Sequence, residues 1–124
     1  MVATTTATGS AVYCNASNGR LLRFTSALKY KQNIRDLESI DINKLRPVRY
    51  NSKSEIDDQT KDYFGFIADE ADEAGLKELV IYNENGEVEG FRYDQVTAVL
   101  VKAIQEQQAI IESLQARITT LEGK

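Results

Sequence analysis

Ser26 and Lys31 are the two residues of this 124-residue chain whose types and spacing best fit a chemical reaction. They lie within the segment TSALKYKQNI, with the serine ahead of the lysine. The chain has no histidine and one cysteine, Cys14, so a histidine-based triad, a cysteine metal cluster and an intrachain disulfide are all excluded. Nucleophilic catalysis would therefore need a serine or threonine, with a lysine or a carboxylate as its base. We expect no metal site and no cofactor.

The chemistry open to Ser26 is attack on a peptide bond. A seryl oxygen reaches the carbonyl that precedes it through a five-membered ring, which makes Thr25–Ser26 the expected cleavage site; attack on a neighbouring chain would lift this restriction. A lysine base must be neutral, although its amine has a reference pKa near 10.4. Desolvation or nearby positive charge, from Lys29 or Arg35, would favour the neutral form. On an extended segment Lys29 and Lys31 point to the same face, so spacing alone does not decide which of them is the base.

Composition places limits on the elements that hold these residues. A chain of this length with 42% hydrophobic residues forms one small domain, and its modest core favours oligomerisation. Residues 20–53 carry nine Lys or Arg against three Asp or Glu, whereas residues 54–94 carry three against thirteen. The two halves could face each other within or between chains, or the basic half could bind nucleic acid. The net charge of −4 and the lack of interleaved basic and aromatic runs favour the first interpretation.

Two β-hairpins are predicted. The first pairs residues 12–14 with 21–24 around Asn18-Gly19, and the second pairs 79–82 with 88–93 around Asn85-Gly86. Asn-Gly suits a type I′ turn, in which both central residues have positive φ. Residues 1–10 are small and Thr-rich without periodicity, so they are either a flexible lead or the end of a β-structured stalk. The N-terminus lacks a signal-peptide pattern, and no apolar run is long enough to cross a membrane.

The middle of the chain predicts a mixture of short elements. Residues 31–45 should be extended and then form a helical turn near residues 41–45, followed by a strand with Pro47 at its start. Residues 51–61 are polar and should form a loop at the tip of a hairpin. Residues 63–68 read as a buried strand that leads into a short helix over 69–74, which Gly75 ends.

From Asp94, a predicted N-cap, the pattern changes to a heptad repeat. The apolar positions step by alternating threes and fours: Ile104, Gln107, Ile111, Leu114, Ile118 and Leu121. This narrow stripe predicts an intermolecular coiled coil, the alternative being an amphipathic helix that packs on its own domain. Isoleucine at a and leucine at d lean towards two strands, and Gln107 at a d position can change register and strand number, so the pattern does not separate a dimer from a trimer.

Several motifs share their order and spacing with one known family. They are Tyr30-Lys31-x-Asn33-Ile34 after Ser26, Arg46-Pro47-Val48-x-Tyr50, Gly65-Phe66-Ile67-Ala68-Asp69-Glu70, and Tyr93 before the terminal helix. From about Asn15 to its end, the chain resembles the C-terminal intramolecular chaperone domains of phage tailspikes, tail fibres and endosialidases, the peptidase S74 family. Ala27 and Asp69 depart from the residues common in that family, and the 51–61 loop is shorter than the family's arm, which puts the arm's role in doubt.

The resemblance implies a trimer in which Ser26 is the nucleophile and Lys31 the base, with Lys29 as its substitute. Asn33 and Glu70 are candidate supporting residues; Glu70 is otherwise a solvated charge at the start of a helix. The implied fold class is α+β, with a hairpin-containing body followed by a long C-terminal helix in a parallel trimeric coiled coil. The expected parts are 1–25, the end of an upstream stalk; 26–95, the chaperone and autoprotease body; and 96–124, the coiled-coil helix.

The implied function is self-cleavage after assembly. The domain would trimerise and register an upstream fibre and then release itself at Thr25–Ser26, as a single-turnover serine autoprotease. The alternative is a non-catalytic trimerisation module that stays attached, while no cofactor loop or pocket motif supports an enzyme acting on other molecules. The expected partners are two further copies and the chain's own upstream stalk, with no nucleic acid, membrane or small-molecule substrate. The resemblance places synthesis in the host bacterial cytoplasm and the parent protein in the virion tail.

Overall fold

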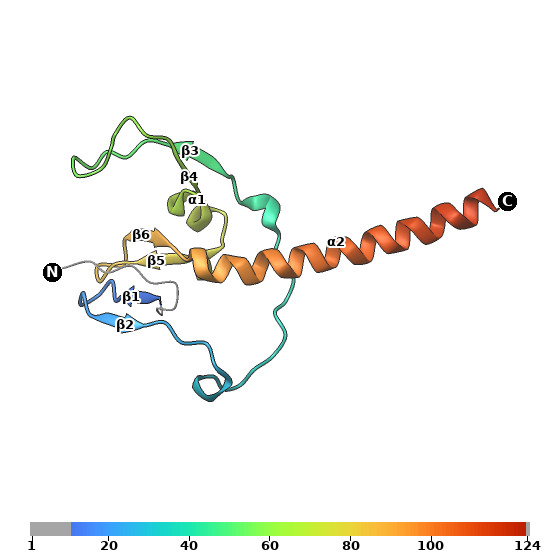
Figure 1. Ribbon diagram of the computed structural model, residues 1–124, viewed down its shortest axis with the longest axis horizontal. Coiled ribbons are helices and arrows are strands. Elements are labelled where there is room, and N and C mark those ends of the chain that lie inside the picture. Colours follow the sequence, from blue (N-terminus) through green and yellow to red (C-terminus); the bar gives the residue numbers. More distant parts are fainter. Residues whose placement is uncertain (1–10, 124) are drawn as a thin grey trace.

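The computed structural model describes residues 11–123, which form a small body around the N-terminal part of one long helix (Figure 1). Its elements are, in order, β1 (Val12–Cys14), β2 (Leu21–Arg23), η1 (Leu28–Tyr30), η2 (Ile42–Lys44), β3 (Val48–Tyr50), β4 (Tyr63–Gly65), α1 (Ala68–Glu73), η3 (Lys77–Leu79), β5 (Val80–Tyr82), β6 (Val88–Phe91) and α2 (Tyr93–Glu122). The predicted α+β class, with small hairpins and a long C-terminal helix, is confirmed. The trimeric coiled coil stays a prediction, and residues 1–10 of the predicted stalk end lie outside the described residues.

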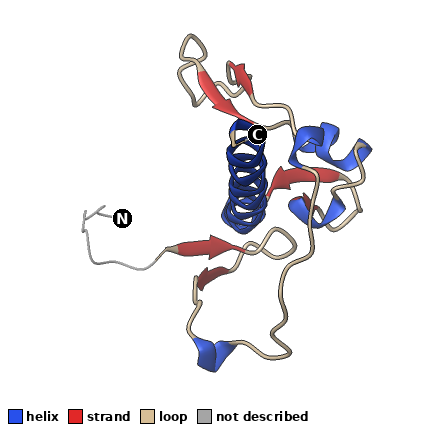
Figure 2. Ribbon diagram, turned by 90° about the vertical axis from the view of Figure 1, so that its right-hand side faces the viewer, coloured by secondary structure: helices blue, strands red, loops and turns tan. Residues whose placement is uncertain are grey.

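The six strands form three separate antiparallel hairpins, β1–β2, β3–β4 and β5–β6. Viewed along α2, they leave the helix axis in different directions (Figure 2). A two-stranded hairpin is at best marginally stable in water unless something packs against it. The body therefore depends on what packs against these hairpins, and among residues 11–123 only β5–β6 is packed against buried side chains.

The β5–β6 hairpin forms part of the hydrophobic core. The buried residues of this core are Ala71, Leu79, Val80, Phe91, Val96 and Val99, which come from α1, η3, β5, β6 and the first turns of α2. Partly buried side chains, among them Leu37, Ile40 and Phe66, pack around them. All the buried side chains of residues 11–123 thus lie between Ala71 and Val99, and the preceding half of the described chain contributes only partly buried groups.

Both Asn-Gly hairpins form where predicted, but the predicted type I′ turns are wrong. Gly19 and Gly86 have left-handed φ values of 71° and 78°, whereas the asparagine before each does not. The first turn is a four-residue loop closed between Asn15 and Arg20. The second is a three-residue loop closed by a hydrogen bond from the Asn83 amide to the Glu87 carbonyl. In such longer loops only the last residue must be left-handed, and glycine fills that position.

The β3–β4 hairpin is a ribbon with little cover on either face. Its strands pair from Val48 with Gly65 to Tyr50 with Tyr63, and the rings of Tyr50 and Tyr63 stack at 5.8 Å between centroids. The prediction of a buried strand over 63–68 is wrong, because the strand ends at Gly65 and Phe64 is 79% exposed. Apolar composition indicated burial, but no second layer of the described residues lies over this ribbon.

The helix α2 carries two different strips in its N-terminal half. Val96 and Val99 are buried against the body, and Ala103 and Glu106 continue their line half-buried. Beside this strip, the predicted seam residues Ile104 and Gln107 are exposed. Beyond Glu106 every described residue of the helix is exposed, and this part projects away from the body (Figure 1). The helix therefore packs on its own domain through one strip and leaves the heptad seam free.

The start of α2 differs slightly from the prediction. The helix begins at Tyr93 with Arg92 as its N-cap, so Asp94 lies in the first turn rather than at the cap. Asp94 remains favourably placed, because carboxylates are stabilised near helix N-termini. Among the described residues no helix is both long enough and apolar enough to span a bilayer.

Candidate active site

Ser26 lies in the exposed segment that follows the first hairpin and leads into η1. The turn is held by two backbone hydrogen bonds, from the Tyr30 amide to the Ala27 carbonyl and from the Lys31 amide to the Leu28 carbonyl, each of 3.0 Å. The comparison of Lys29 with Lys31 assumed an extended segment here, and the structure has a single 3₁₀ turn instead. This turn folds the chain back, so that Ser26 and Lys31 can meet.

The amine of Lys31 lies 2.6 Å from the hydroxyl oxygen of Ser26. The amine of Lys29 instead lies over the ring of Tyr30, 5.2 Å from its centroid. Lys29 and Lys31 therefore do not share a face, because the 3₁₀ turn interrupts the extended backbone on which that expectation depended. Of the two lysines that the sequence left open, the structure brings Lys31 to Ser26.

Thr25 lies directly behind the first hairpin. The pairing of β1 with β2 extends to a hydrogen bond from the Phe24 amide to the Ala11 carbonyl, and the exposed residues Thr25 and Ser26 follow it. The hairpin also contacts the start of α2: hydrogen bonding of the Tyr13 hydroxyl to the Asp94 carboxylate raises the pKa of Tyr13. The Thr25–Ser26 bond thus connects a hairpin that has its own contact with the body to the turn that carries Lys31.

Asn33 has a φ of 54°, in the left-handed region. Its carbonyl accepts a 2.8 Å hydrogen bond from the guanidinium of Arg35. Asn33 therefore shapes the backbone two residues beyond Lys31, and its own side chain is exposed to solvent.

Glu70 is engaged elsewhere. Its carboxylate accepts two hydrogen bonds from the Arg46 guanidinium, one of them 2.9 Å long. This pairing lowers the pKa of Glu70 and raises that of Arg46. The pair joins the segment just before β3 to the first turn of α1. Glu70 lies in the first turn of α1, as predicted for a charge at the start of a helix, and within the single chain it pairs with Arg46 rather than with Lys31.

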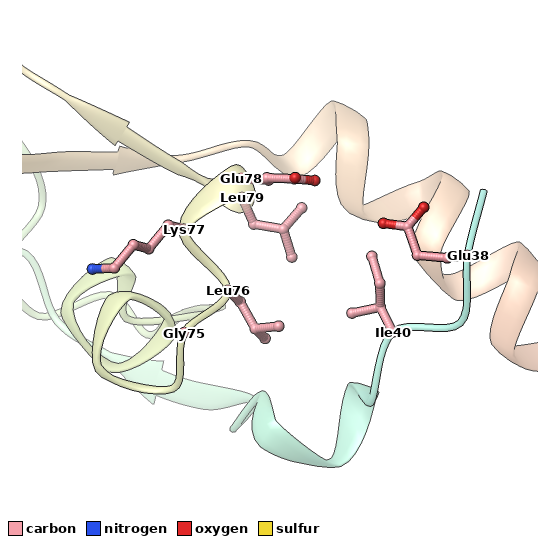
Figure 3. A pocket seen from close by; sticks show the side chains of 7 residues that line it. All are labelled: Glu38, Ile40, Gly75, Leu76, Lys77, Glu78 and Leu79. Carbon is pink, nitrogen blue, oxygen red and sulfur yellow. The ribbon is translucent and has the colours of Figure 1, made fainter. Parts of the chain in front are cut away.

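A pocket of about 340 Å³ lies on the body (Figure 3). Ile40, Leu76 and Leu79 converge in it, and Glu38 and Glu78 stand at its edge. The ammonium of Lys77 points away and donates to Asp72 instead. The pocket contains neither Ser26 nor Lys31, and its lining offers no serine, threonine or cysteine nucleophile.

Comparison with known families identifies the segment that carries Ser26 and Lys31, which we call the dyad. Residues 26–81 match the family model described as peptidase S74, chaperone of endosialidase. We call these residues the S74 segment, after the family model that they match. The resemblance expected from the sequence is thereby confirmed for this segment. No curated protein and no solved structure matches the chain.

The S74 segment begins at Ser26 and ends in β5, so it contains the 3₁₀ turn, the β3–β4 ribbon and α1, but not α2. Two of its contacts were missed from the sequence. Arg46 and Glu70 belong to different family motifs, and their opposite charges were the available signal. Tyr93 was noted as a motif residue without a partner; its hydroxyl bonds the backbone amide of Phe66 at 3.0 Å.

Proposed function

We propose that this domain is a self-cleaving intramolecular chaperone, which assembles an upstream fibre as a trimer and then releases itself by cleavage at Thr25–Ser26. The observation that carries this proposal is the 2.6 Å contact between Lys31 and Ser26 within a segment that matches the chaperone of endosialidase family. The match begins at the same serine that would become the new N-terminus.

The proposed reaction is an N→O acyl shift followed by hydrolysis. The neutral amine of Lys31 takes the hydroxyl proton of Ser26, and the oxygen attacks the carbonyl carbon of Thr25. The peptide C–N bond breaks as an ester forms, and the leaving amine takes up a proton. Water then hydrolyses the ester, which leaves a carboxylate on Thr25 and a free amino group on Ser26. Each chain performs this reaction once and needs no cofactor.

Exposure of the site bears on the timing of cleavage. Ser26 and Lys31 are exposed in the single chain, and so are the apolar side chains of Leu28, Tyr30 and Ile34 nearby. An ammonium in water holds its proton, and desolvation favours the neutral base. Covering this apolar surface in the assembly would therefore activate Lys31, so we propose that cleavage follows trimerisation.

Surface area supports assembly. The chain exposes 10761 Å², whereas a compact monomer of 13.9 kDa exposes roughly 6,700 Å². An excess of this size is comparable with the area that obligate oligomers bury. The exposed seam includes Ile111, Leu114 and Ile118, whose apolar side chains would form knobs of the proposed parallel three-stranded coiled coil.

The proposed benefit of a C-terminal trimer is register. Long β-structured chains that interlock must find non-local contacts, a search that is slow and prone to aggregation. A trimer at one end raises the effective concentration of the chains and aligns them. Cleavage then leaves the finished fibre kinetically trapped. We further propose synthesis in the bacterial host cytoplasm and a parent protein in the virion tail.

Mass measurement of the purified chain tests the cleavage. Wild-type chain should yield fragments 1–25 and 26–124, while Ser26→Ala should stay whole and assemble equally well. A trimer that remains uncut in both forms would instead support the alternative, a trimerisation module that stays attached. Cleavage at another bond would overturn the site assignment.

A further inference from the structure

Asn33 has an unusual backbone conformation close to the dyad. Among residues 11–123 it is the one non-glycine residue with positive φ; the three others, Gly19, Gly75 and Gly86, are glycines at the ends of ordinary turns. Side chains other than glycine avoid this region, although asparagine tolerates it better than most. A residue held in a sparsely populated conformation is a reason to ask what the conformation does.

Packing does not hold the dyad in place. Every residue from Ser26 to Asp36 is exposed, and the first side chain that packs against the core is Leu37. The position of Lys31 therefore depends on backbone geometry on both sides of it. On one side stands the 3₁₀ turn over residues 28–30; on the other stands the left-handed turn at Asn33.

Arg35 stabilises the left-handed turn at Asn33. Its guanidinium donates a 2.8 Å hydrogen bond to the carbonyl of Asn33, which closes a short loop immediately beyond Lys31. From there the chain runs to Leu37 and Ile40, which pack on the core, and to Ser39, whose hydroxyl bonds Glu106 on α2 at 2.9 Å. The loop at Asn33 is thus the joint between the exposed dyad and the segment anchored on α2.

We propose that Asn33 and Arg35 are positioning residues for Lys31. The left-handed backbone at Asn33 sets the direction in which the chain leaves Lys31, and the bond from Arg35 keeps that direction fixed. Together with the 3₁₀ turn they keep the amine beside the Ser26 hydroxyl without any packing. This inference rests on the proposed function, since it assigns a role in the same cleavage reaction.

Backbone-selective substitutions test the inference. Glycine adopts positive φ without steric cost, whereas a β-branched residue resists it. Asn33→Gly should therefore cleave within about threefold of wild type, and Asn33→Val should cleave at least about tenfold more slowly. Arg35→Ala should also be slowed, with Arg35→Lys intermediate, because lysine lacks the planar fork of donors. Asn85→Val is the control, since Asn85 lies in a turn with ordinary φ far along the chain.

A second measurement reads the geometry without cleavage. In 124-residue chains that carry Ser26→Ala and so stay uncut, nuclear Overhauser contacts between the ε-methylene of Lys31 and the β-methyl group at position 26 should be present with Asn33 and with Asn33→Gly, and absent with Asn33→Val. Retention of these contacts in Asn33→Val, or a wild-type cleavage rate in that variant, would overturn the inference while leaving the proposed function intact. Cleavage that persists in Ser26→Ala would overturn the proposed function, and the contacts would still decide whether Asn33 positions Lys31.

Discussion

The hydroxyl of Tyr93 occupies the space where a β-carbon on Gly65 would have to be, and it bonds the next backbone amide, that of Phe66, at 3.0 Å. The first residue of α2 is thereby fastened to the end of the β4 strand. The rings of Phe66, Phe91 and Tyr93 pack around this bond, with centroids between 4.9 and 6.1 Å apart. One close contact thus joins the S74 segment to the helix that follows it.

Gly65→Ala should destabilise the body. The new methyl group must displace the Tyr93 hydroxyl, and overpacking of this kind typically costs about 1–3 kcal/mol. Chemical denaturation followed by circular dichroism measures the loss. Gly90→Ala is the matched control, because a β-carbon there would meet Ile81 at an ordinary 3.5 Å. Equal stability of the two variants would show that the Tyr93 side chain can move aside without lowering the stability of the fold.

Lys31 should be required for cleavage through its neutral amine. Lys31→Ala and Lys31→Arg should both abolish cleavage, because a guanidinium is not deprotonated in proteins. Lys29→Ala is the control: its amine lies over the ring of Tyr30, so its loss should slow cleavage only modestly. The wild-type rate should rise with pH as the amine loses its proton. A rate that is flat between about pH 6 and 9 would remove lysine from the mechanism.

The seam on α2 should hold the assembly together. Truncating a buried isoleucine costs about 2–5 kcal/mol, and a symmetric oligomer incurs this loss in every chain. Ile111→Ala combined with Ile118→Ala should therefore abolish assembly at micromolar concentration in sedimentation experiments. Ile110→Ala, an exposed isoleucine of the same helix outside the heptad seam, should leave assembly intact. A double variant that stays trimeric would assign assembly to the β-rich body.

The same sedimentation samples should be tested for cleavage. If apolar cover in the trimer activates Lys31, the dissociated double variant should cut much more slowly than wild type. Ile110→Ala should cut at the wild-type rate. Undiminished cleavage by dissociated chains would show that the dyad works within one chain without assembly.

Asp72 should make stability sensitive to acid. Its carboxylate accepts hydrogen bonds from the Tyr82 hydroxyl and the Lys77 ammonium, and these lower its pKa. A carboxylate whose pKa is lower in the folded state adds stability above the unfolded pKa of about 3.9, and this stability is lost as pH falls through the folded value. The difference in unfolding free energy between wild type and Asp72→Asn should therefore be full above about pH 5 and shrink towards pH 2. Glu73→Gln serves as a comparison, and a pH-independent difference for Asp72→Asn would contradict this assignment.

Local signals in the sequence predicted the regular elements well. Glycine at the ends of turns located the two Asn-Gly hairpins, Gly75 marked the end of α1, and heptad spacing predicted α2. The type I′ turns were wrong because asparagine is compatible with either sign of φ, so the dipeptide does not fix the length of the loop. Burial of the 63–68 segment was wrong because apolar composition does not say whether a second layer exists to cover a strand.

The two residues of the candidate site could be predicted from the sequence, but the backbone conformation that brings them together could not. Nothing in Leu28, Lys29 and Tyr30 favours a 3₁₀ turn strongly, so Lys29 and Lys31 stayed equivalent as candidates for the base. The left-handed φ of Asn33 accompanies a hydrogen bond from the Arg35 guanidinium to its carbonyl, a contact that spacing alone does not reveal. The pairing of Arg46 with Glu70 joins residues far apart in sequence and follows from the tertiary fold.

In the proposed trimer, the two strips of α2 would separate folding from assembly in time. Val96 and Val99 complete the core within one chain, while the adjacent seam residues stay free for other copies. Core formation is accordingly a first-order event whose rate does not depend on protein concentration, whereas closure of the seam is a higher-order event that dilution slows. In the function proposed above, a newly made chain would hold a folded body before it meets its partners, and the local density of chains would set when the fibre is registered.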